Sequence, residues 1–175
     1  MERSKAIFGG DSRPIRCGFL SETATGEMMK ICILDNDTID EALVPTYRSY
    51  GAMLEKVLRQ AGATDWAMDH FSTPHQQYPA SFDDYDAVLL TGSKADSFSD
   101  EAWVVELRRR VTELLKTDTK LLGICFGHQL IAYCLGAKVA RAPQGWVTGR
   151  NTYQWHDADF AASGREQFAL LASHQ

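Results

Sequence analysis

The sequence predicts an α/β fold, with a mainly parallel sheet flanked by helices, from two observations. Short apolar runs, typical of strands buried on both faces, alternate with segments whose apolar residues recur every three or four positions. Strands and helices in this alternating order are typical of a parallel sheet covered by helices. The chain has 175 residues, 45% of them hydrophobic, which is enough for one domain with its own core.

The predicted strands are short and apolar, and in chain order they span 31–34, 65–71, 85–91, 120–124 and 138–141. Beyond residue 140 the pattern weakens. There we expect β segments at 146–153 and 168–172 that form a mixed or antiparallel extension.

Three amphipathic helices are predicted between the strands. The first runs from Tyr50 to Ala61 and is closed by Gly62, because a glycine readily adopts the conformation that ends a helix. The third spans 127–135 and ends at Gly136 in the same way. The second carries one apolar side, formed by Trp103, Leu107, Val111, Leu114 and Leu115.

Residues 1–28 differ in composition from the rest of the chain. Gly, Ser, Thr, Arg and Glu dominate them, and no apolar period is visible. We expect a disordered or extraneous leader there, followed by one α/β domain over 29–175.

Composition also narrows the classes of function. The net charge is -5, which does not favour a nucleic-acid partner, and no apolar run is long enough to predict a membrane span. The four cysteines lack CxxC spacing, so neither a zinc site nor any other metal or cofactor is predicted. Scattered cysteines without a secretory signal are typical of reduced thiols, and we expect a cytoplasmic protein.

The most informative segment is a strand-to-helix junction around Cys125. Gly123 and Gly127 flank the cysteine, and a sharp turn that presents a nucleophile requires such small neighbours. The turn places the sulfur at a helix N-terminus, which favours the reactive thiolate. A free cysteine is often only a small buried hydrophobe, and Cys134, which lacks this frame, is interpreted in that way.

The frame Gly123-x-Cys125-x-Gly127-x-Gln129 resembles the nucleophile motif of the class I glutamine amidotransferases, whose domain is flavodoxin-like. The glycine turn that follows the third strand, at Gly92, resembles a second feature of that family. The resemblance covers residues 29–175 and is strongest to the amidotransferase domain of GMP synthase.

The resemblance implies a role for each matched residue. Cys125 would attack the side-chain amide of glutamine, form a γ-glutamyl thioester and release ammonia. The backbone N–H groups of Gly92 and Phe126 would form the oxyanion hole. Gln129 and Ser93 would contact the substrate. Gln129 can also be an ordinary polar helix residue, and Gly92 only a turn glycine.

The turn departs from the family in one respect. The family often has Gly-Gly-Pro or Asn-Gly-Pro there, whereas this chain has Thr91-Gly92-Ser93. Because proline restricts the backbone, its absence predicts a less rigid turn.

The general base and its orienting acid are not present in this chain. In the family they lie in a His-x-Glu segment near the C-terminus, and none of His128, His156 and His174 belongs to such a segment. His128 is predicted to be packed, His156 to lie on the surface or in a loop, and His174 to border the pocket. The chain is interpreted either as a truncated amidotransferase or as a naturally short protein that has lost the pair. Both predict weak or absent glutamine hydrolysis.

Three functions stay open on the sequence. One is an amidotransferase that passes ammonia to a synthase on a separate chain. The second is a hydrolase of γ-glutamyl bonds, and the third is a non-catalytic binding or regulatory module. The last predicts that Cys125 reacts with an alkylating agent no faster than Cys134.

Overall fold

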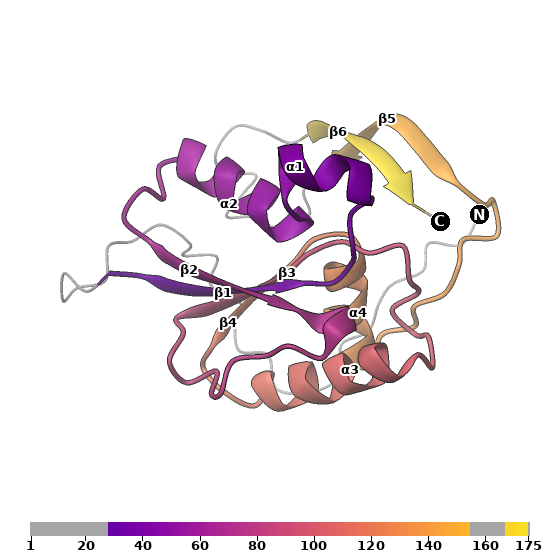
Figure 1. Ribbon diagram of the computed structural model, residues 1–175. Helices are drawn as coiled ribbons and strands as arrows, with labels where there is room; N and C mark the ends of the chain where they lie inside the picture. The colour runs from indigo at the N-terminus through magenta and orange to yellow at the C-terminus, as the bar shows by residue number, and fades with distance from the viewer. Residues whose placement is uncertain (1–27, 155–166, 175) are drawn as a thin grey trace. The chain divides into compact units, whose positions relative to one another are not determined.

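The computed structural model describes residues 28–154 and 167–174 of the chain. The chain divides into two compact units, residues 1–139 and 140–175. The first unit confirms the predicted α/β fold, because its sheet is entirely parallel, with the strand order β2-β1-β3-β4 (Figure 1). Its strands are β1 (Lys30–Asp35), β2 (Ala67–Ser72), β3 (Ala87–Leu90) and β4 (Lys120–Gly123).

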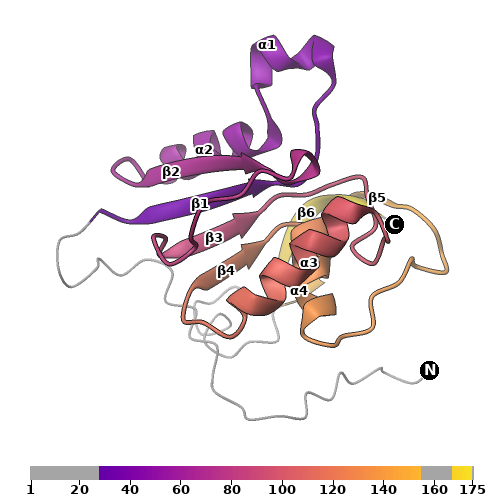
Figure 2. The ribbon, with the colours of Figure 1, turned by 60° about the horizontal axis from the view of Figure 1, so that its bottom comes forward.

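Helices cover both faces of this sheet. Helix α2 (Tyr50–Gln60) lies on one face, and α3 (Ala102–Leu114) and α4 (Phe126–Cys134) lie on the other (Figures 1 and 2). A short exposed excursion, η1 (Glu41–Leu43) and α1 (Val44–Tyr47), stands away from the sheet between β1 and α2 (Figure 2). One further 3-10 turn, η2 (Thr73–His75), follows β2.

Side chains along β1 and β3 alternate between the two faces of the sheet. Ile31 and Ile33 of β1 face Leu54 and Leu58 of α2 in one core cluster. The intervening side chains belong to the second cluster, with α3 and α4: Cys32, Leu34, Val88, Leu90, Val104, Leu107, Val111, Phe126 and Leu130. Both faces are apolar because successive side chains of a strand point to opposite faces and each face carries helices.

Local chemistry sets the ends of the helices. Ser49 precedes α2, and its side chain accepts a hydrogen bond from the Ala52 N–H at 3.1 Å. Such a cap satisfies an N–H that the helix leaves without a partner. Gly62 and Gly136 have φ of 108° and 86°, which confirms the glycine stops predicted after α2 and α4.

The second unit is an antiparallel pair, β5 (Val147–Gln154) and β6 (Gln167–His174). It confirms the β extension predicted after residue 140. Val147 pairs with His174, and the Tyr153 and Phe168 rings stack at 5.5 Å between centroids.

The strand predicted over 138–141 is wrong. These residues follow the end of α4 without regular structure, and three of the four are exposed. A four-residue run that begins with Lys138 and ends with Arg141 buries too little to hold a place in a sheet. The leader predicted over 1–28 lies outside the described residues, apart from Met28.

Candidate functional site

Cys125 is held in a strained turn between β4 and α4. It is the N-cap residue of the helix, with φ 51° and ψ −108°, and its side chain is exposed. A non-glycine residue at positive φ costs on the order of 1–3 kcal/mol and persists only where the surroundings enforce it. The predicted sharp elbow is therefore present, and it presents the thiol to solvent.

Two glycines make this turn possible. A Cβ at Gly123 would lie 2.4 Å from the backbone carbon of Gly127, and a Cβ at Gly127 would lie 2.6 Å from the Leu90 Cβ. Both distances are far inside van der Waals contact, so neither position has room for a side chain. The close approach of β4, α4 and β3 at this point requires both glycines.

The backbone around the cysteine is fixed by hydrogen bonds and packing. The Ile124 N–H donates to the Leu90 carbonyl at 3.0 Å, and the Gln129 N–H donates to the Cys125 carbonyl at 3.0 Å. Phe126 is buried, and its ring packs on Trp103 at 5.6 Å between centroids. Because Phe126 is the first helical residue, its N–H has no partner within the helix.

The turn at Gly92 lies beside the thiol. A Cβ at Gly92 would lie 3.6 Å from the Cys125 Cβ, which is ordinary contact without a clash. The structure thus brings together Gly92, Cys125 and Phe126 at the carboxyl edge of the sheet, where ligands bind in parallel α/β folds. Gln129 is half-buried one turn into α4, and the Ser93 Oγ accepts a hydrogen bond from the Ala95 N–H at 3.1 Å.

The Gly92 turn is anchored although it lacks the proline. The Asn36 side chain donates to the Thr91 carbonyl at 3.0 Å, and the Lys94 N–H donates to Asp37 Oδ2 at 2.8 Å. Asn36 and Asp37 both lie in the loop after β1, the strand next to β3. Hydrogen bonds from that loop therefore restrain this turn on both sides of Gly92.

The other described cysteines have a different environment. Cys134 is half-buried, its Sγ lies 3.6 Å from the Arg108 carbonyl, and burial raises its pKa above the usual range. Cys32 is buried in the sheet, and burial, with a smaller contribution from Asp69, raises its pKa to about 12. Both remain protonated thiols at neutral pH, and the interpretation of Cys134 as part of the core is confirmed.

Three histidines follow Cys125 in the chain, and the structure of the first unit describes one of them, His128. His128 is exposed, so the prediction that it is packed is wrong: the buried face of α4 is formed by Phe126, Gly127 and Leu130, and His128 points away from it. His156 lies outside the described residues, and His174 ends β6 in the second unit.

A histidine–carboxylate pair that the sequence reasoning missed lies at the opposite edge of the sheet. His70 Nε2 lies 2.8 Å from Glu55 Oε2. Because β2 is three strands from β4, this pair is roughly 14 Å from the elbow, at 4.7–4.9 Å per strand spacing. It is therefore too far away to take a proton from Cys125.

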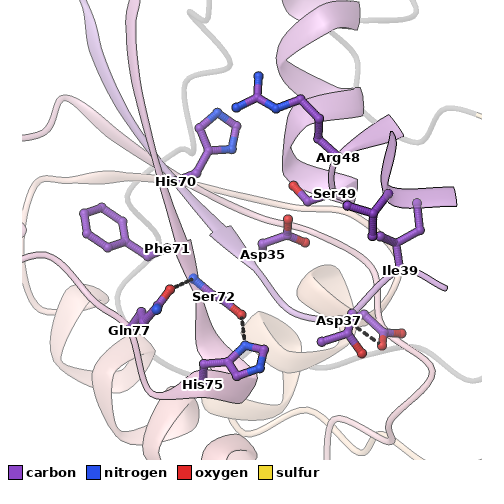
Figure 3. Close-up of a pocket in the computed structure, with 12 residues that line it drawn as sticks. Asp35, Asp37, Ile39, Arg48, Ser49, His70, Phe71, Ser72, His75 and Gln77 are labelled. Atoms are coloured by element: carbon purple, nitrogen blue, oxygen red, sulfur yellow. Dashed lines mark hydrogen bonds between the residues drawn. The ribbon is translucent and has the colours of Figure 1, made fainter. Parts of the chain in front are cut away.

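His70 of this pair lines an open pocket of about 410 Å³ at the carboxyl ends of β1 and β2 (Figure 3). Asp35 lines it but is buried, and its Oδ2 accepts a hydrogen bond from the Gly51 N–H at 2.9 Å. His75 lines it as well, with its Nδ1 2.7 Å from the Ser72 Oγ. Asp35 and His75 each have their own hydrogen-bond partner, Gly51 and Ser72, and the lining includes neither Gly92 nor Cys125.

No helix in 28–154 or 167–174 is long and apolar enough to cross a membrane. In the same ranges, no group of three or more His, Cys, Asp or Glu side chains is arranged to hold a metal ion.

An exposed cysteine in a glycine-flanked elbow at the carboxyl edge of a parallel sheet defines a class of α/β proteins with a nucleophile at the strand-to-helix turn. The family model described as glutamine amidotransferase class-I matches residues 42–175. The chain belongs to the class I glutamine amidotransferase family.

Individual relatives carry names of both kinds expected from the motif. A Saccharomyces cerevisiae protein named as a glutamine amidotransferase is 35% identical over 158 residues, which are 83% of this chain and 62% of that protein. Gamma-glutamyl peptidase 4 of Arabidopsis thaliana is 37% identical over 102 residues, 57% of this chain and 39% of that protein. The glutamine-hydrolysing GMP synthase of Bifidobacterium longum is 31% identical over 96 residues, 55% of this chain and 16% of that protein.

The fold is shared with solved structures. A glutamine amidotransferase from Thermotoga maritima superimposes with a TM-score of 0.67 at 22% identity, over 85% of this chain and 61% of that one. The predicted class I amidotransferase-like, flavodoxin-like fold is therefore confirmed. The chain spans about three fifths of the length of the yeast relative and of this structure.

Proposed function

We propose that Cys125 is the nucleophile of a glutaminase-type site that cleaves the γ-amide of glutamine. The observation that carries this proposal is the strained, exposed conformation of Cys125 between two glycines that no side chain could replace. Strain of this kind is retained where it serves a site, because it otherwise only lowers stability. Membership of the amidotransferase family supports glutamine as the substrate.

In the proposed reaction the Cys125 thiolate attacks the γ-carbonyl carbon of glutamine. A C–S bond forms, and the carbonyl electron pair moves to oxygen, where the N–H groups of Gly92 and Phe126 stabilise the oxyanion. Collapse of this intermediate breaks the C–N bond, the nitrogen takes a proton and leaves as ammonia, and a γ-glutamyl thioester remains. Water then hydrolyses the thioester to glutamate and the free thiol. Gln129 and Ser93 are proposed to contact the substrate.

The protonation of the leaving nitrogen requires a general acid–base group. No His-x-Glu segment follows Cys125 among residues 126–175. We therefore propose that the 175-residue chain by itself both forms and hydrolyses the thioester slowly, with water supplying the proton to the leaving nitrogen, since these proton transfers typically contribute about 100- to 10,000-fold.

A γ-glutamyl hydrolase is the second candidate, and the match to a gamma-glutamyl peptidase favours it. Both candidates share the same acyl-enzyme and differ in the leaving group, which is ammonia in one and the amine of a γ-glutamyl peptide in the other. In the first, the ammonia would pass to an acceptor on a separate synthase chain.

The test is capture of the acyl-enzyme on Cys125. The parent chain is mixed with excess glutamine, or with a γ-glutamyl dipeptide, quenched in acid and mapped by mass spectrometry. We expect a γ-glutamyl adduct on Cys125, and the substrate with the faster adduct formation identifies the leaving group. In Cys125→Ser the rate of product release should fall by at least about 1,000-fold.

Cys134→Ser is the matched control, because it removes a thiol nine residues away and should keep the adduct. If neither substrate leaves an adduct on Cys125 and Cys125 is alkylated no faster than Cys134, the chain is a non-catalytic module and the proposal is wrong.

A further inference from the structure

A buried polar network connects the loop after β1 to the turn at Gly92. Asn36 is fully buried, and its backbone N–H, its side-chain NH₂ and its side-chain oxygen all form hydrogen bonds. Its backbone N–H donates to Thr91 Oγ1 at 2.8 Å, and its side-chain NH₂ donates to the Thr91 carbonyl at 3.0 Å. Its side-chain oxygen accepts from Thr73 Oγ1 at 2.9 Å. Buried bonds of this kind define one geometry, because an unmade bond there is costly.

These bonds determine the direction of the Gly92 N–H. A trans peptide is planar, so the Thr91 carbonyl and the Gly92 N–H point in opposite directions. Because the carbonyl points to Asn36, on the β1 side, the N–H points away from β1. Strand β3 lies between β1 and β4, so that direction is towards the extension of β4, where Cys125 lies.

The neighbouring hydrogen bonds agree with this direction. The Thr91 N–H donates to the Leu34 carbonyl of β1, whereas the Leu90 carbonyl accepts from the Ile124 N–H beyond β4, both at 3.0 Å. Backbone groups therefore alternate between the two neighbouring strands, and Gly92 follows Leu90 in facing β4. Thr91 Oγ1 also lies 3.1 Å from the Gly92 carbonyl, which defines the next peptide plane.

We propose that Asn36 is a positioning residue that, by binding both polar groups of Thr91, directs the Gly92 N–H to the carbonyl oxygen of a substrate acylating Cys125. This inference rests on the proposed function. It explains how a turn without a proline is restrained: side-chain hydrogen bonds from the β1 loop hold Thr91 and Lys94 on either side of Gly92. Asn36 does not touch substrate, and acts only through Gly92.

Two reactions of the same sulfur separate this role from a general effect on the elbow. p-Nitrophenyl butyrate has the acyl chain of the glutamine γ-carbonyl: attack by the thiolate passes through an oxyanion, forms a thioester and releases p-nitrophenolate. Iodoacetamide reacts at a CH₂ carbon, forms a C–S bond and releases iodide, so no oxyanion arises. The ratio of acylation to alkylation rates at Cys125, each followed by peptide mapping, reports the oxyanion donors alone.

In Asn36→Ala we expect acylation of Cys125 to fall about 10- to 100-fold, somewhat less than for loss of a complete donor, while alkylation changes by no more than about threefold. Thr91→Val should lower acylation in the same direction, and Thr91→Ser, which keeps the hydroxyl, should restore it. Tyr85→Phe is the control for stability, because it removes the hydrogen bond from the buried Tyr85 hydroxyl to Asp69 Oδ2 (2.8 Å) at the amino end of β3, outside the Asn36 network, and it should leave the ratio unchanged.

Equal losses of acylation and alkylation in Asn36→Ala would assign Asn36 to support of the whole elbow and overturn the positioning role. An unchanged ratio in both Asn36→Ala and Thr91→Val would overturn it as well. If Asn36→Ala does not fold, the comparison of Thr91→Val with Thr91→Ser decides the question. A parent chain whose Cys125 is alkylated but never acylated contradicts the proposed function itself, and the positioning role with it.

Discussion

The two ends of α4 each carry a cysteine, and the two side chains lie in opposite environments. At the N-terminal end Cys125 is exposed, sits at positive φ and is flanked by glycines that have no room for a side chain. At the C-terminal end Cys134 is half-buried beside the Arg108 carbonyl, and burial raises the pKa of its thiol. Burial favours the neutral form of the Cys134 thiol. The same side chain is thus exposed at one end of α4 and packed against the core at the other.

The largest expected difference between the ends concerns their glycines. In Gly127→Ala the new methyl would overlap Leu90, so either the elbow or the strand must move, at a cost of about 3 kcal/mol or more in the free energy of unfolding. In Gly136→Ala nothing lies within 4 Å, and only the positive φ is strained, at about 1 kcal/mol. Urea unfolding of both variants measures this contrast.

The alkylation rate of Cys125 in the same two variants locates the damage. Gly127→Ala should change that rate under native conditions, whereas Gly136→Ala should leave it within about twofold. Equal destabilisation by both substitutions would contradict the inference that the close contact of α4 with β3 requires a glycine at position 127.

A smaller difference is expected in the reactivity of the two thiols. With iodoacetamide at pH 7, Cys125 should be alkylated at least about tenfold faster than Cys134, because Cys134 is half-buried and its raised pKa leaves little thiolate. Raising the pH increases the thiolate fraction, so the Cys134 rate should still climb above pH about 8.5, the usual pKa of a cysteine. Peptide mapping at a series of pH values follows both sites in one sample. Equal rates at pH 7 would contradict the contrast.

The smallest expected effect is that glycine at Cys125 and glycine at Cys134 change the free energy of unfolding in opposite directions. Replacing Cys125 by glycine removes the strain of a side chain at positive φ and should raise the free energy of unfolding by about 1 kcal/mol. The same replacement at Cys134 puts a glycine at the last residue of α4 and removes packing, and should lower the free energy of unfolding by about 1 kcal/mol. Thermal unfolding of the two variants checks the signs. A loss of stability at both positions would mean that the elbow is not strained.

Much of the fold and part of the site could be predicted from the sequence. The strands of the first unit and its helices α2, α3 and α4 follow from periodicity, because the apolar pattern along each segment reflects the faces that it buries, whereas the short exposed α1 was not predicted. The elbow follows from Gly123 and Gly127, since their spacing around Cys125 is a local property of a tight turn. The strand expected over 138–141 failed because a short apolar run has the same pattern whether or not a partner strand is available.

Local sequence by itself therefore determined which residues form the elbow, and that Cys125 and not Cys134 is its nucleophile candidate. Only the tertiary structure determined the surroundings of the elbow. His128 lies outside the buried face of α4, and the His70–Glu55 pair lies at the β2 edge of the sheet. Asn36 binds Thr91 from 55 positions away in the chain. The physical reason is that periodicity and turn chemistry act over a few residues. Hydrogen bonds between loops depend instead on the order β2-β1-β3-β4, which places the end of β1 next to the end of β3.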